Sequence, residues 1–281
     1  MLTSSRIAGT SVVLLLMIGL NPLLGQQRPL QTDDPKTLAS GKARFQLGFE
    51  YLQNKTFTLS GLEGDLTRLG VVGFFVGAGP RVEFQATGTL LNALNIHRRF
   101  PAHDTPQLSF QGDSTTSIGD FTLATKFALI EERHSVPAIG FRFGVELPNA
   151  GNEKGMGNDQ TNFYADILLG KTIGRWRTIA NVGLAILGNP TMVSSQKDQL
   201  TFGGAVSYEL NPRLTLLGEI NGRQGPSGPG TDEQAQFRLG ARIRTGNFRW
   251  DFAAEVGTRQ GDPDSGVAFG ASYEFQPFRK K

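Results

Sequence analysis

The residues best suited to chemistry in this chain are arginines and carboxylates that recur at every second position. They are densest in residues 234–255, where Arg238 and Arg242 and then Asp251 and Glu255 alternate with apolar residues. Opposite charges on one face of a sheet can pair with each other, or can attract and select charged solutes. The pattern therefore indicates an electrostatic role rather than covalent chemistry.

A period of two places alternate side chains on opposite faces of a strand. Gly246 and Asn247 interrupt the alternation and predict a two-residue hairpin turn. That turn predicts three cross-strand pairs, which are Arg242 with Asp251, Arg238 with Glu255, and Ile243 with Trp250. One face of the hairpin is charged and the other apolar, so the two faces must meet different surroundings.

Residues for catalysis are poorly placed. His97 and His103 lie in the longest expected loop, His134 lies in a tight turn, and the chain has no cysteine. Metalloprotease, lipase, phosphate-cradling and zinc-site motifs are all missing from the sequence. We therefore predict no enzyme activity, no catalytic residue, no cofactor and no metal site.

The alternating pattern repeats along the chain and predicts about twelve strands, each near the roughly 9–11 residues that cross an outer membrane at a tilt. The links between them alternate between short and long. Tight links are expected at residues 78–80, 131–135, 174–175, 211–212 and 246–247. Longer polar links are expected at residues 54–65, 92–117, 148–161, 189–197, 224–233 and 260–265.

This alternation is typical of an outer-membrane barrel with short periplasmic turns and longer outer loops. A soluble sandwich or lipocalin is the alternative, but it has no reason to keep short and long links in strict alternation or to repeat a charged second face. We therefore predict an all-β fold, a transmembrane antiparallel β-barrel of about twelve strands. Closure is required because an open sheet would leave backbone groups unpaired in lipid.

The N-terminus predicts export. Arg6 precedes an apolar core at residues 12–20 and an imperfect cleavage site at residues 23–25. A membrane anchor is the alternative, but the apolar run falls short of the ~20 residues that span a bilayer. Residues 1–25 are therefore predicted to be a signal peptide that directs Sec-type export.

The remaining chain divides into three parts. We predict a periplasmic N-terminal leader at residues 26–41, the barrel at residues 42–278, and a solvated basic tail at residues 279–281. A second reading of the leader is that residues 32–35 fold into the barrel lumen and meet basic side chains there.

Short motifs in a fixed order carry a family resemblance. They are residues 28–35, Arg-Pro-Leu-Gln-Thr-Asp-Asp-Pro, with Gly41 before the first strand; Ile-Gly-Asp at 118–120 with Lys126 and Phe127; and Glu-Leu-Pro at 146–148 before a Gly/Asn-rich loop. The chain resembles the outer-membrane transporter family named for the meta-pathway of phenol degradation. This resemblance covers nearly all of the mature chain. It implies a β-barrel with a role in uptake of small, often aromatic or hydrophobic compounds.

The charged face supplies the candidate pore-lining residues. Arg142 and Arg238 are expected nearest the middle and best placed to constrict the pore, and a five-residue turn at 131–135 would set Asp120 opposite Glu146. The alternative role of these charges is to brace the wall as ion-pair ladders. The candidates are Arg44, Glu50, Asp120, Lys126, Arg142, Glu146, Asp166, Arg238, Arg242, Arg244, Asp251 and Glu255.

The sequence thus predicts a channel or transporter for passive uptake of small solutes in the outer membrane of a Gram-negative bacterium. Aromatic or hydrophobic compounds are the candidate solutes that the family resemblance implies. The alternative is a structural or adhesion barrel whose long loops bind a partner. The expected partners are outer-membrane lipid and a small-molecule solute. Basic residues alternate with acids, and net charge is only +3, so no nucleic-acid partner is expected.

Overall fold

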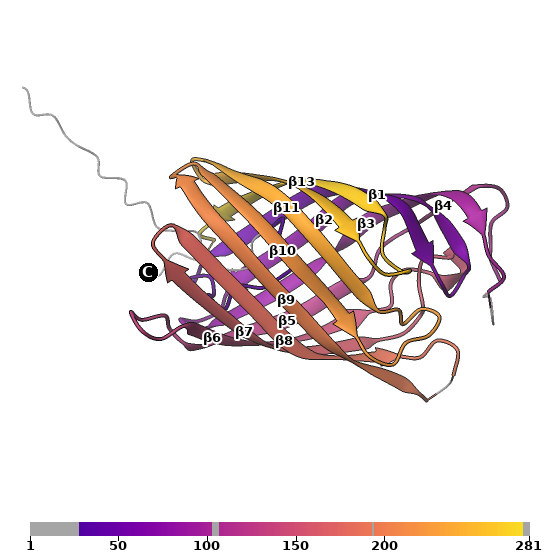
Figure 1. Cartoon of the computed structure of the whole chain (residues 1–281), viewed down its shortest axis with the longest axis horizontal. Helices are drawn as coiled ribbons and strands as arrows, with labels where there is room; N and C mark the ends of the chain where they lie inside the picture. Colours follow the sequence, from indigo (N-terminus) through magenta and orange to yellow (C-terminus); the bar gives the residue numbers. More distant parts are fainter. Residues whose placement is uncertain (1–27, 103–106, 193, 278–281) are drawn as a thin grey trace, which may run out of the picture.

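The chain forms one antiparallel sheet that closes on itself. The computed structural model describes residues 28–102, 107–192 and 194–277 (Figure 1). The strands are β1 (Ala43–Phe57), β2 (Leu62–Gly77), β3 (Val82–Arg99), β4 (Ser114–Ser117), β5 (Phe121–Ile130), β6 (Ala138–Leu147), β7 (Asn162–Ile173), β8 (Trp176–Gly188), β9 (Gln196–Asn211), β10 (Leu214–Gln224), β11 (Gln234–Thr245), β12 (Phe248–Gly257) and β13 (Ser265–Phe275). A short 3₁₀ helix, η1 (Asn152–Lys154), follows β6. No helix among the described residues is long and apolar enough to cross a membrane.

Twelve columns of strand make up the barrel wall. Each strand pairs with its neighbours in chain order, β13 returns to β1, and β2 pairs with β3 to complete the ring. The four-residue β4 shares a column with β5, because both pair with the same edge of β3 and residues 118–120 interrupt them. The predicted barrel of about twelve strands is therefore confirmed.

The two faces of the wall differ as the alternation predicts. Along β12, Phe248, Trp250 and Phe252 are exposed on the outside, whereas Arg249 and Asp251 are buried inside. Large apolar side chains are exposed in the same way on the other strands. A soluble monomer rarely exposes so continuous an apolar surface, so this band is suited to lipid.

The hairpin of β11 and β12 has the predicted register. Arg242 is opposite Asp251, Arg238 is opposite Glu255, and Ile243 is opposite Trp250. Gly246 adopts a positive φ of 61°, which a two-residue hairpin turn favours and glycine accepts without strain.

We call the end of the barrel with the tight links the turn end, and the opposite end the loop end. Both β1 and β13 meet the turn end, which lies at the left in Figure 1. Aromatic rings gather on the outside there: Trp250 stacks on Phe248 at 6.2 Å between centroids, Phe248 lies 4.8 Å from Tyr273, and Trp176 lies 4.6 Å from Tyr208. Amphipathic rings prefer a membrane interface, so this girdle marks where one bilayer surface meets the wall.

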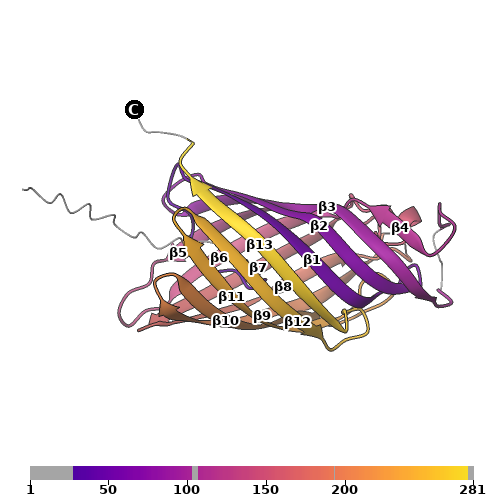
Figure 2. The same cartoon turned by 90° about the horizontal axis from the view of Figure 1, so that it is seen from above.

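Two predicted long links were wrong. Residues 54–65 mostly continue β1 and β2 with only a tight turn between them, and residues 92–117 contain the end of β3 and all of β4. These strands therefore rise beyond their neighbours at the loop end, where β4 lies at the right in Figure 2. A buried apolar cluster inside the mouth stabilises the extension, consisting of Leu52, Leu62, Leu66, Leu94 and Ile96.

The predicted signal peptide and basic tail lie outside the described residues. The leader is described from Arg28 onward. Its residues 28–38 run inside the barrel and contact inward-facing residues of the wall, which is the second of the two readings given for residues 32–35.

Candidate functional site

The leader is packed into the lumen by an apolar anchor. Leu30 is only 5% exposed and contacts inward-facing side chains from three successive strands, Ile179 of β8, Ala205 of β9 and Leu217 of β10. Burial of an apolar side chain away from water is favourable, so the small apolar patch on the otherwise polar inner wall binds Leu30 in one position. The anchor fixes the leader against one side of the barrel.

Wall carboxylates bind the backbone of the leader. Glu219 of β10 accepts hydrogen bonds from the backbone N–H of Gln31, at 2.9 and 3.0 Å, and from that of Thr32. Glu83 of β3 accepts the N–H of Leu38 at 2.7 Å. An irregular segment needs such partners, because buried backbone donors without them are costly.

The two aspartates of the leader bind arginines of the wall. Asp33 Oδ2 lies 3.1 Å from Arg142 Nε of β6. Asp34 receives both Arg177 Nη2 at 2.7 Å and Arg177 Nε at 3.0 Å from β8, a bidentate arrangement. Both aspartates are almost fully buried, so each pair is held away from bulk solvent.

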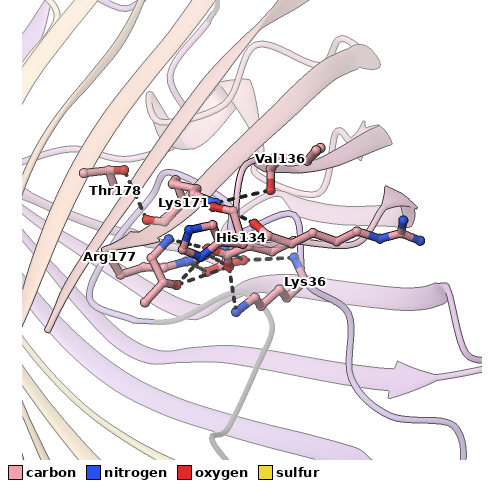
Figure 3. Close-up of polar contacts among 10 residues, drawn as sticks. Lys36, His134, Val136, Lys171, Arg177 and Thr178 are labelled. Carbon is pink, nitrogen blue, oxygen red and sulfur yellow. Dashed lines mark hydrogen bonds and ion pairs between the residues drawn. The ribbon is translucent and has the colours of Figure 1, made fainter. Parts of the chain in front are cut away.

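At the turn end, the same arginine joins the leader to the link between β5 and β6. Arg177 Nη1 lies 2.7 Å from Glu132 Oε2, which also lies 3.3 Å from Lys36 Nζ of the leader. Figure 3 shows Lys36 and Arg177 converging beside this link, where Lys171 Nζ donates to the carbonyls of Arg133 and His134 at 2.6 and 2.8 Å. We call Asp34, Lys36, Glu132 and Arg177 the latch.

A fully buried ion pair lies beside the latch. Lys126 Nζ of β5 is 3.1 Å from Glu83 Oε1 of β3, and neither side chain is exposed. Lys126 also donates to the carbonyl of Asp34 at 3.1 Å, while Glu83 holds Leu38. One cation of the wall thus binds a backbone carbonyl of the leader, and one carboxylate of the wall binds a backbone N–H.

The sequence-predicted candidates face the lumen, but many contact the leader rather than an open pore. Arg28 of the leader lies 3.3 Å from Asp251 and 3.8 Å from Glu50. Arg238 donates to the carbonyl of Pro29 and Arg242 to that of Arg28. Arg142 and Arg238 were expected to constrict an open pore, whereas here both hold the leader.

The other candidates are divided between the two ends. Arg44 pairs with Glu274 at 3.1 Å near the turn end, where Arg244 lies opposite Arg249. Glu255 pairs with Arg238, as the ladder predicted. Asp166 lies 3.7 Å from Arg142 on the loop-end side of the leader.

One predicted register was wrong. Glu146 is opposite Thr122, and Asp120 precedes β5, so the two carboxylates are diagonal neighbours rather than a direct pair. The link between β5 and β6 has seven residues, 131–137, instead of five, which shifts the register by two residues. Asp120 accepts the N–H groups of Asn149 and Ala150, both at 2.8 Å.

A partly open chamber of about 440 Å³ lies between the leader and the outer loops. Gln31, Thr32 and Asp33 form its floor. Eight of the 27 residues that line it are charged, namely Asp33 of the floor and Lys55, Asp120, Arg142, Glu146, Asp166, Arg223 and Asp232 around it. A chamber so lined suits polar solutes more than apolar ones.

Three outer links meet above the chamber. Thr58, between β1 and β2, donates its hydroxyl to Asp232 Oδ2 at 2.7 Å and accepts the N–H of Gly230 at 2.9 Å. Asn158, after η1, donates to the carbonyl of Gly230 at 3.3 Å. The outer loops therefore line the chamber on one side and the leader lines it on the other.

Sequence reasoning missed the wall residues Glu83, Arg177 and Glu219 as leader ligands. The alternation pattern shows that these side chains face the inside of the barrel. A local pattern cannot show which residues they bind when the partners are more than 40 positions away in the sequence. The available signal was the Asp33-Asp34 pair, two adjacent acids preceding a barrel whose inner face carries excess arginine. Among the described residues, no group of three histidine or carboxylate side chains gathers as a metal site would require.

The charge at Asp120 depends on pH near neutrality. Burial raises the pKa of the Asp120 carboxyl to about 6, its two backbone donors oppose the shift, and the nearby Glu146 carboxylate adds to it. Asp120 is therefore charged above about pH 6 and neutral below it. We expect cation preference through the loop-end mouth to fall as pH drops from about 7 to about 5, measured by reversal potential in a leader-deleted variant.

Asp120→Asn in that same variant is the matched control. It should show reduced cation preference at all pH values and no step near pH 6. An unchanged step in the substituted protein would assign the titration to another group.

Known structures share this fold at low sequence identity. An outer-membrane channel from Pseudomonas putida F1 superposes with a TM-score of 0.62 at 13% identity, covering 86% of this chain and 98% of that one. KdgM porin gives a TM-score of 0.49 at 11% identity, covering 83% and 99% of the two chains. No curated protein is similar enough in sequence to count as a relative. The family described as "Putative MetA-pathway of phenol degradation" matches residues 26–275, nearly the whole chain, and the chain therefore belongs to that family.

Proposed function

We propose that this protein is an outer-membrane channel for passive uptake of small solutes, closed at rest by its own leader. The observation that carries the proposal is the leader inside the lumen, held mainly by polar and ionic contacts. A structural plug would be expected to bury a larger apolar surface than Leu30 and Leu38, the two buried leucines of the leader, provide. Movement of the leader would connect the chamber to the turn end.

The orientation follows from the fold. Short turns and both chain ends belong to the periplasmic side of bacterial outer-membrane barrels, so the turn end faces the periplasm and the loops face outward. The signal peptide predicted at residues 1–25 agrees with this placement. Transport of this kind requires positioned charges rather than a catalytic group.

The exposed apolar band and the aromatic girdle support placement in a membrane. Fractionation should recover the protein with outer membranes, and the folded protein should migrate differently on a gel before and after heating. Recovery as a soluble periplasmic protein would overturn the proposal.

The channel itself is tested in planar bilayers. Purified protein should give discrete conductance steps that are rare or small at rest, because the leader occupies the lumen. If the leader-deleted variant is also silent, the barrel is not a channel. A structural or adhesion role for its outer loops would then replace this proposal.

A further inference from the structure

The chamber has an acidic side whose carboxylates lack cationic partners. Glu146 accepts hydrogen bonds from Asn162 Nδ2 at 2.7 Å and from the Tyr164 hydroxyl at 3.4 Å. Within the described chain, Asp120 accepts the two backbone donors already given, the N–H groups of Asn149 and Ala150. Within residues 28–102, 107–192 and 194–277, neither carboxylate forms an ion pair, although both line the chamber. We call Asp120 and Glu146 the acidic side.

The chamber also has a basic side whose cations lack carboxylate partners. Lys55 Nζ of β1 donates to the carbonyl of Gly261, and Arg223 Nε of β10 donates to the carbonyl of Asp232 at 3.0 Å. Both acceptors are neutral backbone groups, and neither cation forms an ion pair in the part of the chain that the structure describes. We call Lys55 and Arg223 the basic side.

Two further carboxylates lie near the basic side but are engaged elsewhere. Asp232 accepts the hydroxyl of Thr58, and Asp262 accepts the backbone N–H groups of Ala235 and Arg259 at 2.9 and 3.1 Å. Their negative charges partly offset the positive potential around Lys55 and Arg223, but neither carboxylate forms an ion pair with these cations within the described residues. Arg142, the remaining cation of the chamber, is already paired with Asp33 and Asp166.

The barrel keeps the two sides apart. In the ring of twelve columns, β6 is four steps from both β10 and β1, so Glu146 comes from a strand a third of the circumference away from the strands of Arg223 and Lys55. The two cations also come from separate strands, but both lie near Asp232, which interacts electrostatically with each of them. Among the described residues, neither carboxylate of the acidic side pairs with either cation of the basic side. Charges partly withdrawn from water without partners are costly, so a ligand that supplies both missing charges is favoured over one that supplies neither.

We propose that the chamber binds a small zwitterion, a molecule such as an amino acid or dipeptide that carries both an ammonium and a carboxylate group. The ammonium binds at the acidic side and the carboxylate at the basic side. This inference rests on the proposed function, since it names the class of solute that the channel admits. Phe57, Leu59 and Met156 are the large apolar residues of the lining whose side chains can reach the chamber, which leaves limited contact for a purely hydrophobic cargo.

Calorimetry on the full-length folded protein tests the proposal with glycylglycine as the probe. Ethylamine and acetate, which carry one charge each, are the comparison ligands. We expect glycylglycine to bind more tightly than either. Glu146→Gln and Lys55→Met should each weaken it by about tenfold or more, the loss of one charge-assisted hydrogen bond.

The single-charge ligands separate the two sides. Glu146→Gln should reduce ethylamine binding and leave acetate unchanged, and Lys55→Met should do the reverse. Asp113→Asn, whose side chain is 84% exposed outside the chamber, is the matched control and should change nothing. Asp120→Asn serves as a second acidic-side variant if Glu146→Gln fails to fold, as judged by heat-modifiable migration.

Two results would overturn the proposal: glycylglycine binding no more tightly than ethylamine or acetate, or binding that both substitutions leave unchanged. The first would make the chamber a simple ion site, and the second would place binding elsewhere. Failure of the channel proposal looks different, since a leader-deleted barrel would then stay silent in bilayers while the chamber still bound the probe.

Discussion

Deletion of residues 29–38 should raise the conductance of the barrel several-fold over that of the full-length protein. This segment carries the Leu30 anchor, both aspartates and the Leu38 contact, so its removal empties the lumen on the turn-end side of the chamber. Twelve columns with inward polar side chains then enclose a water-filled path. Single-channel recording in planar bilayers measures the effect directly.

A same-length glycine and serine segment in place of residues 29–38 is the control. It retains chain in the periplasm or lumen but cannot form the anchor or the ion pairs, so its conductance should approach that of the deletion with added noise. Conductance equal to that of the full-length protein in both variants would show that the leader does not close the path.

Arg177→Ala should shift the leader towards an undocked state by about a hundredfold. The substitution removes the bidentate pair with Asp34 and the contact with Glu132, and it leaves a buried carboxylate without its cation. Loss of one partner from a buried pair costs about 3 kcal/mol or more, and every 1.4 kcal/mol is about tenfold in an equilibrium. Open probability in single-channel records is the readout.

Arg175→Ala is the matched control, because Arg175 is an exposed arginine in the neighbouring turn that contacts no leader residue in the described chain. It should leave open probability unchanged. Asp34→Ala should open the channel to a similar degree, and the double substitution should add little, since the two residues act as one pair. Additive effects would show that Arg177 and Asp34 act through separate contacts.

The wall of the barrel was predictable because its rules are local. Alternation assigned each strand two faces, and Gly246 with Asn247 defined a two-residue turn that fixed the register from Arg238 to Glu255. Register errors arose where the turn length was misjudged. The seven-residue link 131–137 displaced Asp120 from Glu146, because each strand slides when the link is longer than assumed.

The leader was not predictable in the same way. It has no periodicity, and its position depends on ion pairs such as Asp33 with Arg142 and Asp34 with Arg177, which join residues over 100 positions apart. From composition alone, the leader was predicted to lie in the periplasm, with a position in the lumen as the alternative. The extension of β1 to β3 at the loop end was missed because the polar residues at 54–65 and 92–117 suggested links, whereas Leu62 and Leu94 pack together once these neighbouring strands pair.

A disulfide between leader and wall provides the most direct measurement. A side chain at Gly203 would place its Cβ 3.4 Å from the Cβ of Thr32, close to the separation that a disulfide requires, and the chain has no other cysteine. The T32C/G203C pair in the Arg177→Ala background should be silent in bilayers when oxidised and should regain frequent openings on reduction. Equal conductance before and after reduction, with the crosslink confirmed by mass spectrometry, would contradict closure by the leader.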